Sequence, residues 1–132
     1  MDLRCNATKL AEIAGKEKAA FVVLFGSLAK GQAGAQSDVD IGIMYKQYPE
    51  HPYESFRNLT AAFENDNLDM VDLNQENPLL HFRIATEGKV LWQENPFAFR
   101  RFQNEASKQY ADTAKFRRLR EQFMKDQSSG HR

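Results

Sequence analysis

Apolar and polar positions alternate along the chain with two different periods, and these periods predict an order of helices and strands. Across residues 3–18, apolar side chains recur every three or four positions, which predicts a helix with one apolar face. Residues 19–25 are all apolar and rich in β-branched and aromatic types, which is typical of a strand buried on both faces. Residues 39–44 and 68–73 are short, largely apolar runs that include Asp, and we expect them to be the second and third strands. The first part of the chain therefore mixes helix with strand.

Four further elements follow from the same patterns. They are a helix over 53–64, a helix from Pro78 to Gly88, a short strand over 89–92 and a helical segment from Pro96 almost to the end. The apolar stripe of the last segment loses its period between Tyr110 and Phe116, which predicts a kink or two helices. We therefore expect an α/β (α+β) fold: a small mixed sheet flanked by helices, with a long C-terminal helical segment.

The length of 132 residues is typical of one domain. We expect a single domain over 1–132, with its core at about 19–92 and a helical tail at about 96–128. Lys and Arg together number 18, as do Asp and Glu, so the formal net charge is zero. This balance argues against strong nucleic-acid binding, because phosphate binding requires a cationic surface.

The cysteine content and the hydropathy of the chain indicate the cellular compartment in which we expect the protein. Cys5 is the single cysteine, which excludes an internal disulfide or a zinc site of several cysteines and favours a reducing, cytoplasmic setting. The longest apolar run is 19–25, much shorter than the roughly 20 residues of a membrane-spanning helix. Residues 1–2 are not followed by a cationic and then apolar stretch, so we expect no signal peptide.

The turn after the first strand carries candidate phosphate-binding groups. Gly26 permits unusual backbone angles and the close approach of a ligand. Ser27 offers a hydroxyl and a backbone N–H, a group that suits phosphate at the start of a helical turn. Lys30 adds a positive charge about one turn later.

Acidic residues gather at the entrance to the second strand. Asp38 and Asp40 are two positions apart, so on a strand both carboxylates project to the same face. A divalent cation between them would relieve their repulsion, and hard oxygen ligands suit Mg²⁺. Asp69, on the third strand, is expected to point to the same place, whereas Asp72 falls on the opposite face and is expected to be solvated or to cap a turn. Three carboxylates facing a phosphate cradle are typical of metal-assisted phosphoryl or nucleotidyl transfer.

The arrangement Gly26-Ser27, ten residues, then Asp38-Val39-Asp40 resembles the signature of the DNA polymerase beta nucleotidyltransferase superfamily. Residues 68–74 look like the strand that supplies its third carboxylate. The short length, early signature and helical tail are similar to the minimal nucleotidyltransferases, and among them to the adenylyltransferase antitoxins that pair with HEPN-domain ribonuclease toxins. The resemblance covers about residues 19–92.

This resemblance implies a nucleotidyltransferase fold and a set of roles. Asp38, Asp40 and Asp69 would bind Mg²⁺, as two ions, and Asp69 would act as base for the incoming hydroxyl. Gly26 and Ser27 would hold the phosphates of ATP, the AMP donor, with pyrophosphate leaving. The acceptor would be a tyrosine of a HEPN-type toxin, which adenylylation silences.

Lys30 is a departure from the family pattern, since many relatives have Arg there. Lys keeps the charge but loses the bidentate geometry of Arg, so we expect weaker orientation of the phosphates without loss of activity.

Two other functions remain open on the sequence. The chain could neutralise a toxin by masking it, without catalysis, or it could be a small-molecule nucleotidyltransferase of the antibiotic-modifying type. The C-terminal segment favours the first alternative, because it has more aromatic side chains than one buried helix face can hold. It also carries a basic cluster, which is either a solvated helix face or a surface for RNA or an acidic partner: Lys115, Arg117, Arg118 and Arg120. A homo- or hetero-oligomer through this segment is possible.

The histidines show no metal-ligand spacing, and we expect His51, His81 and His131 to be structural or solvated.

Overall fold

The centre of the fold is a mixed four-stranded sheet. A computed structural model describes residues 3–26, 28–29, 31 and 38–129, with side chains described up to residue 125. Its strands are β1 (Ala19–Phe25), β2 (Val39–Tyr45), β3 (Leu68–Asp72) and β4 (Lys89–Gln93). They lie in the order β3-β2-β1-β4, so the first strand of the chain occupies an interior position. β1 is antiparallel to β2 and β4, whereas β2 and β3 are parallel.

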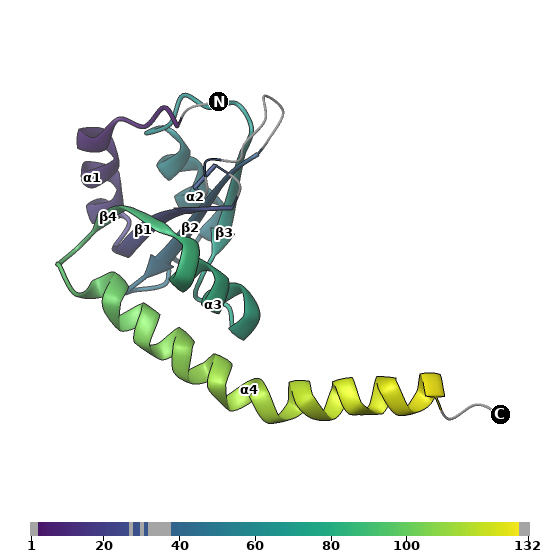
Figure 1. Cartoon of the computed structure of the whole chain (residues 1–132). Coiled ribbons are helices and arrows are strands. Elements are labelled where there is room, and N and C mark those ends of the chain that lie inside the picture. The colour runs from purple at the N-terminus through teal and green to yellow at the C-terminus, as the bar shows by residue number, and fades with distance from the viewer. Residues whose placement is uncertain (1–2, 27, 30, 32–37, 130–132) are drawn as a thin grey trace.

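Helices cover both faces of this sheet. They are α1 (Ala7–Lys16), α2 (Pro52–Thr60), α3 (Pro78–Glu87) and α4 (Ala98–Ser129). α1 and α2 lie on one side of the sheet, while α3 and the first half of α4 lie on the other (Figure 1). Within the described residues, no helix is both long enough and apolar enough to span a bilayer. The observed architecture confirms the expected mixed sheet flanked by helices, with a long C-terminal helix.

Alternation along the strands divides the buried side chains between two cores. Ile41 and Ile43 of β2 face α1 and α2, where they pack with Leu10. Phe21 of β1 points to the opposite face, and its ring centroid lies 5.1 Å from that of Phe102 on α4. Because successive strand residues point to opposite faces, the all-apolar β1 supplies both cores.

Two predicted helices are longer than the observed ones. α1 begins at Ala7, not at residue 3, because the Asn6 side chain accepts a hydrogen bond from Lys9 N at 3.0 Å and caps the helix. Cys5, placed in this helix by its periodicity, instead forms an isolated β-bridge with Phe63. α2 ends at Thr60 and not at residue 64.

α4 is one continuous helix, which changes direction near its middle as it leaves the body of the protein (Figure 1). Phe99, Phe102 and Ala106 in its first half are buried in the second core. Tyr110 marks the end of the packed part, where its ring stacks on Phe82 of α3 at 3.9 Å. The break in periodicity therefore corresponds to the point at which α4 loses contact with the domain.

Candidate active site

Asp40 and Asp69 lie side by side on the two parallel strands. They are partners in the register of β2 and β3, and neighbouring strands are about 4.8 Å apart. Asp40 points to the same face of the sheet as Met44 on β2, and Asp69 points to the same face as Val71 on β3. Met44 and Val71 pack into the core beneath α3 and α4. The structure thus brings these two predicted carboxylates together on one face, at the end of the sheet where β1 ends.

Asp38 belongs to the same electrostatic environment. It is exposed and lies just before β2, two residues from Asp40. The pKa of Asp40 is raised, chiefly by burial and then by the negative charges of Asp69 and Asp38. Arg83 of α3 opposes this effect and lowers the pKa of Asp40. Three carboxylates therefore act on one another here, and ionisation of the middle one is disfavoured.

Gly26 is in close contact with this acidic group. It follows β1 with φ of +80°, a conformation that L side chains rarely adopt. A Cβ added to Gly26 would overlap the carboxylate of Asp40. The backbone angle favours glycine at this position, and any larger residue would also force the Asp40 carboxylate to move.

Ser27 and Lys30, the other predicted phosphate-binding residues, lie outside the described residues. The turn around them is partly described, since Gly31 N donates to Leu28 O at 3.2 Å. Their roles remain predictions.

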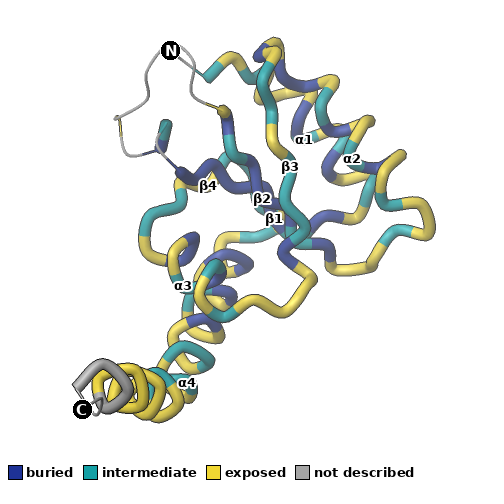
Figure 2. Tube along the Cα trace, turned by 90° about the vertical axis from the view of Figure 1, so that its right-hand side faces the viewer, coloured by how far each residue is buried: buried dark blue, intermediate teal, exposed yellow. Residues whose placement is uncertain are grey.

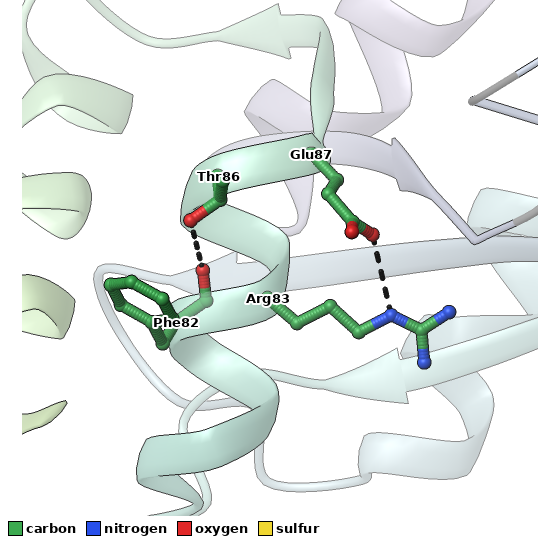
Figure 3. A network of polar contacts seen from close by, with 4 residues as sticks. All are labelled: Phe82, Arg83, Thr86 and Glu87. Atoms are coloured by element: carbon green, nitrogen blue, oxygen red, sulfur yellow. Dashed lines mark hydrogen bonds and ion pairs between the residues drawn. The ribbon is translucent and has the colours of Figure 1, made fainter.

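Arg83 is a candidate site residue that the sequence reasoning missed. It lies on α3, the helix that covers the acidic face, and its Nε donates to Glu87 Oε2 at 3.3 Å (Figure 3). Its side chain is half exposed, and its charge reaches Asp40. No signal in the sequence pointed to Arg83, because its charge reaches Asp40 only through the packing of α3 on the sheet, which periodicity does not predict.

The donor chemistry of the acidic group suits a hard divalent cation. Carboxylate oxygens are the ligands that Mg²⁺ prefers. Burial is the main cause of the raised pKa of Asp40, and the charges of Asp69 and Asp38 add a repulsion that a bound cation would relieve. Among the described residues, no group of three or more His, Cys, Asp or Glu side chains is gathered closely enough to hold a metal ion. The residues fit Mg²⁺ by chemistry and position, while complete coordination requires further ligands or side-chain rotation.

Asp72 has the structural role expected for it. It accepts hydrogen bonds from Asn74 N at 2.9 Å and from Tyr48 Oη, so it holds the turn after β3. Asp72 points to the opposite face of the sheet from Asp69, so the two acids of β3 lie in different surroundings.

His81 lies apart from the acidic group. It is buried on α3, tilted against Phe102 with ring centroids 5.3 Å apart, and burial lowers its pKa. It lines a cavity of about 460 Å³ together with Met44 and Lys46, at the opposite ends of the strands from Asp40. This placement supports the structural reading of His81. His51 is exposed at the start of α2, and His131 lies outside the described residues.

Two curated proteins are similar to this chain in sequence. One, the protein adenylyltransferase MntA of Aphanizomenon flos-aquae, is 34% identical over 94 residues, or 62% of each chain. The other, the protein adenylyltransferase MntA of Shewanella oneidensis, is 31% identical over 77 residues, which cover 57% of this chain. The matches span 62% and 55% of the lengths of these two relatives.

Solved structures share the fold. A toxin–antitoxin crystal structure with AMP-PNP superposes with a TM-score of 0.72 at 23% identity, covering 90% of this chain and 98% of the other. A complex of the tri-AMPylated Shewanella oneidensis HEPN toxin with an MNT antitoxin gives a TM-score of 0.65 at 22% identity, covering 90% and 96%. The family described as Polymerase beta, Nucleotidyltransferase matches residues 8–97, which include Gly26 and the three carboxylates. This chain therefore belongs to the polymerase beta nucleotidyltransferase family.

Proposed function

We propose that this chain is a metal-dependent adenylyltransferase that transfers AMP from ATP to a tyrosine hydroxyl of a HEPN-type ribonuclease toxin and thereby neutralises it. The observation that carries the proposal is the pairing of Asp40 with Asp69 beside Gly26. The names of its relatives support the acceptor, because two are protein adenylyltransferases and one solved complex holds an AMPylated HEPN toxin. We place the reaction in the cytoplasm and treat residues 1–132 as one catalytic domain.

In this proposal Asp38, Asp40 and Asp69 hold two Mg²⁺ ions. Mg²⁺ held by these carboxylates would supply positive charge to neutralise the phosphates and the oxygens at which charge develops. Asp40 would hold the metal together with Asp69, its neighbour in the register of β2 and β3, and with Asp38. Asp69 accepts the proton of the tyrosine hydroxyl, a role that its exposed position at the edge strand β3 allows.

The groups around the carboxylates orient the triphosphate. Gly26 brings its backbone close to Asp40, and the turn that follows it carries Ser27 and Lys30, to which we assign phosphate binding. Arg83 is the described cation whose charge reaches Asp40, and it balances the acidic group from the α3 side. These residues bind and position ATP with its α-phosphorus beside the carboxylates.

The test is transfer of AMP to a partner, read by intact-mass spectrometry. Purified chain, Mg²⁺, each of the four nucleoside triphosphates and the product of the adjacent reading frame would be combined. We expect a mass gain of AMP on the partner with ATP, and a loss of rate of about 10²–10³-fold in Asp69→Asn, since a metal ion contributes several kcal/mol. Asp72→Asn is the matched control on the same strand and should stay within a few-fold of wild type. Equal activity of both variants would refute the assigned role of Asp69.

A second function, masking of the toxin without catalysis, is favoured by one observation. Residues 118–125 of α4 are all exposed, and they include the large apolar residues Leu119, Phe123 and Met124. A chain that acts by masking alone would still inhibit its partner after Asp38→Asn and Asp40→Asn together. We expect that double variant to bind the partner and to leave it active as a ribonuclease.

A further inference from the structure

The distal half of α4 carries an apolar stripe that nothing in the described chain covers. The stripe consists of Phe116, Leu119 and Phe123, whose side chains are 72%, 54% and 60% exposed. They recur at spacings of three and four, so they lie along one face of the helix. Figure 2 shows the exposed character of this part of α4, where it extends beyond α3. We call these three residues the distal stripe.

The distal stripe does not continue the face by which α4 packs on its own domain. The packed positions run through Phe102 and Ala106 and end at Tyr110, whose ring stacks on Phe82 of α3. At about 100° per residue, the centre of the distal stripe is rotated by about 100° from this packed face. The distal stripe is therefore not a core face that happens to overrun the domain.

A helix without tertiary contacts requires another source of stability. Isolated helices shorter than about 12–15 residues are marginal in water, and helical segments in proteins gain most of their stability by packing an apolar face. Residues 118–125 are all exposed, yet they are helical. A second macromolecule that covers the distal stripe would supply the missing packing.

Charges around the distal stripe restrict what that macromolecule is. Residues 111–125 contain five cationic and two acidic side chains, a net charge of +3 in a chain whose total is zero. In a heptad frame with Phe116 and Phe123 at position a and Leu119 at d, Lys115 occupies g and Arg120 occupies e. These flanking positions determine partner choice in helix pairs.

A second copy of this chain fits the distal stripe poorly. In a parallel pair Lys115 would face Arg120 of the second copy, and in an antiparallel pair the two Arg120 side chains would face each other. Both arrangements place like charges together, which opposes association. An amphipathic helix with acidic flanks reverses the sign of each pair and covers the same apolar residues.

We propose that the distal stripe is a docking site for an amphipathic helix of a partner protein whose apolar residues are flanked by Asp or Glu. The two phenylalanines and Leu119 anchor the contact, and Lys115 and Arg120 select the acidic partner. The identification of this partner with the protein that receives AMP rests on the proposed function. The docking surface itself does not.

The first test uses a synthetic probe with the full chain. It is a labelled peptide of about three heptads with Leu at a and d and Glu at e and g, and its counterpart has Lys at e and g. Fluorescence anisotropy should show binding of the Glu peptide that weakens as salt increases, with no binding of the Lys peptide. The double variant Phe116→Ser with Phe123→Ser, which we call the stripe variant, should bind the Glu peptide at least tenfold more weakly. Phe97→Ser is the matched control, because Phe97 is 61% exposed but lies before α4.

Four results would overturn the docking proposal. They are absence of Glu-peptide binding, equal binding of the Lys peptide, an unchanged affinity in the stripe variant, and self-association in sedimentation velocity that Leu119→Glu abolishes. Binding of anionic phospholipid vesicles or single-stranded RNA in place of the Glu peptide would also overturn it, by assigning the basic flanks to a different class of ligand.

A second measurement separates this inference from the proposed function. With the product of the adjacent reading frame, the stripe variant should lose both co-purification and AMP transfer. If wild type transfers no AMP while the Glu peptide still binds, the proposed function fails and the docking site stands. If the stripe variant transfers AMP at the wild-type rate, the docking of the acceptor fails and the proposed function stands.

Discussion

The contact between Gly26 and Asp40 links a backbone angle to the position of a carboxylate. Gly26 and Gly31 both have positive φ, of 80° and 71°, but only Gly26 has a neighbour in the space that a Cβ would fill. These two glycines therefore allow backbone strain and displacement of Asp40 to be measured separately.

We expect Gly26→Ala to reduce AMP transfer by about 100-fold, because small displacements of reacting groups have effects of that size. Gly31→Ala should cost a similar backbone strain of about 1–2 kcal/mol and leave transfer near the wild-type rate. Urea denaturation and the transfer rate, measured on both variants, check the prediction. An equal loss of activity in the two variants would mean that the strain, and not Asp40, limits the reaction.

Asp40 should also affect stability in a pH-dependent way. Its pKa is raised in the folded protein, so its ionised form destabilises the fold, and this cost develops as pH rises above the ordinary carboxyl pKa of about 3.9. We expect Asp40→Asn to raise the Tm of the metal-free protein at neutral pH, with a smaller gain near pH 4. Calorimetry in EDTA, with exposed Asp66→Asn as control, measures this difference. A lower Tm for Asp40→Asn at neutral pH would contradict it.

Prediction from sequence at the residue scale succeeded where strand parity applied. Parity placed Asp40 and Asp69 on one face and Asp72 on the other, because side chains alternate strictly along a strand. It could not place Arg83, whose proximity to Asp40 depends on how α3 packs across the sheet. The roles of Ser27 and Lys30 remain predictions.

At the element scale, α4 consists of two halves with different physical roles. Its first half completes the second core, where Phe102 packs on Phe21 and His81. In its second half, residues 118–125 are all exposed. One helix thus serves both as a structural element and as an extended surface.

The same substitution, Phe to Ala, should affect stability differently in the two halves of α4. Phe102→Ala removes a buried ring and should lower the free energy of unfolding by about 3–5 kcal/mol. Phe116→Ala removes an exposed ring on the same helix and should change it by less than about 0.5 kcal/mol. Urea unfolding followed by circular dichroism compares them. Similar losses would show that the distal half packs on the domain in solution.

The ends of elements illustrate what periodicity alone missed. Strand bounds were predicted closely: β1 is a continuous apolar run, and β2 and β3 are short, largely apolar runs. Helix starts were less accurate: Asn6 caps α1 and leaves Cys5 to pair with Phe63, a contact between segments far apart in sequence. The predicted break in α4 was a change of direction within one helix, and the apolar pattern did not distinguish that from two helices.

At the scale of the whole molecule, the folding unit includes residues beyond the matched family segment, which ends at residue 97. Ala98, Phe99 and Phe102 are buried against β1 and α3. The first half of α4 therefore belongs to the core on which the site is built, while the second half does not.

Two truncations test this division. A chain of residues 1–112 should unfold cooperatively, with a Tm within a few degrees of the full chain, because it keeps the buried residues of α4. A chain of residues 1–97 keeps the family segment but loses Phe99 and Phe102, and should fail to fold cooperatively. Calorimetry distinguishes the two, and cooperative unfolding of the shorter chain would contradict this account.

The interior position of β1 has a consequence during synthesis. β1 pairs with β2 soon after both have emerged from the ribosome, but its other edge waits for β4. Phe25 and Lys89 are separated by about 60 residues, which take about 3–12 s to add at ordinary translation rates. Throughout that interval an all-apolar strand has one unpaired edge, which is a template for aggregation. Slow codons between β3 and β4 would lengthen this exposure.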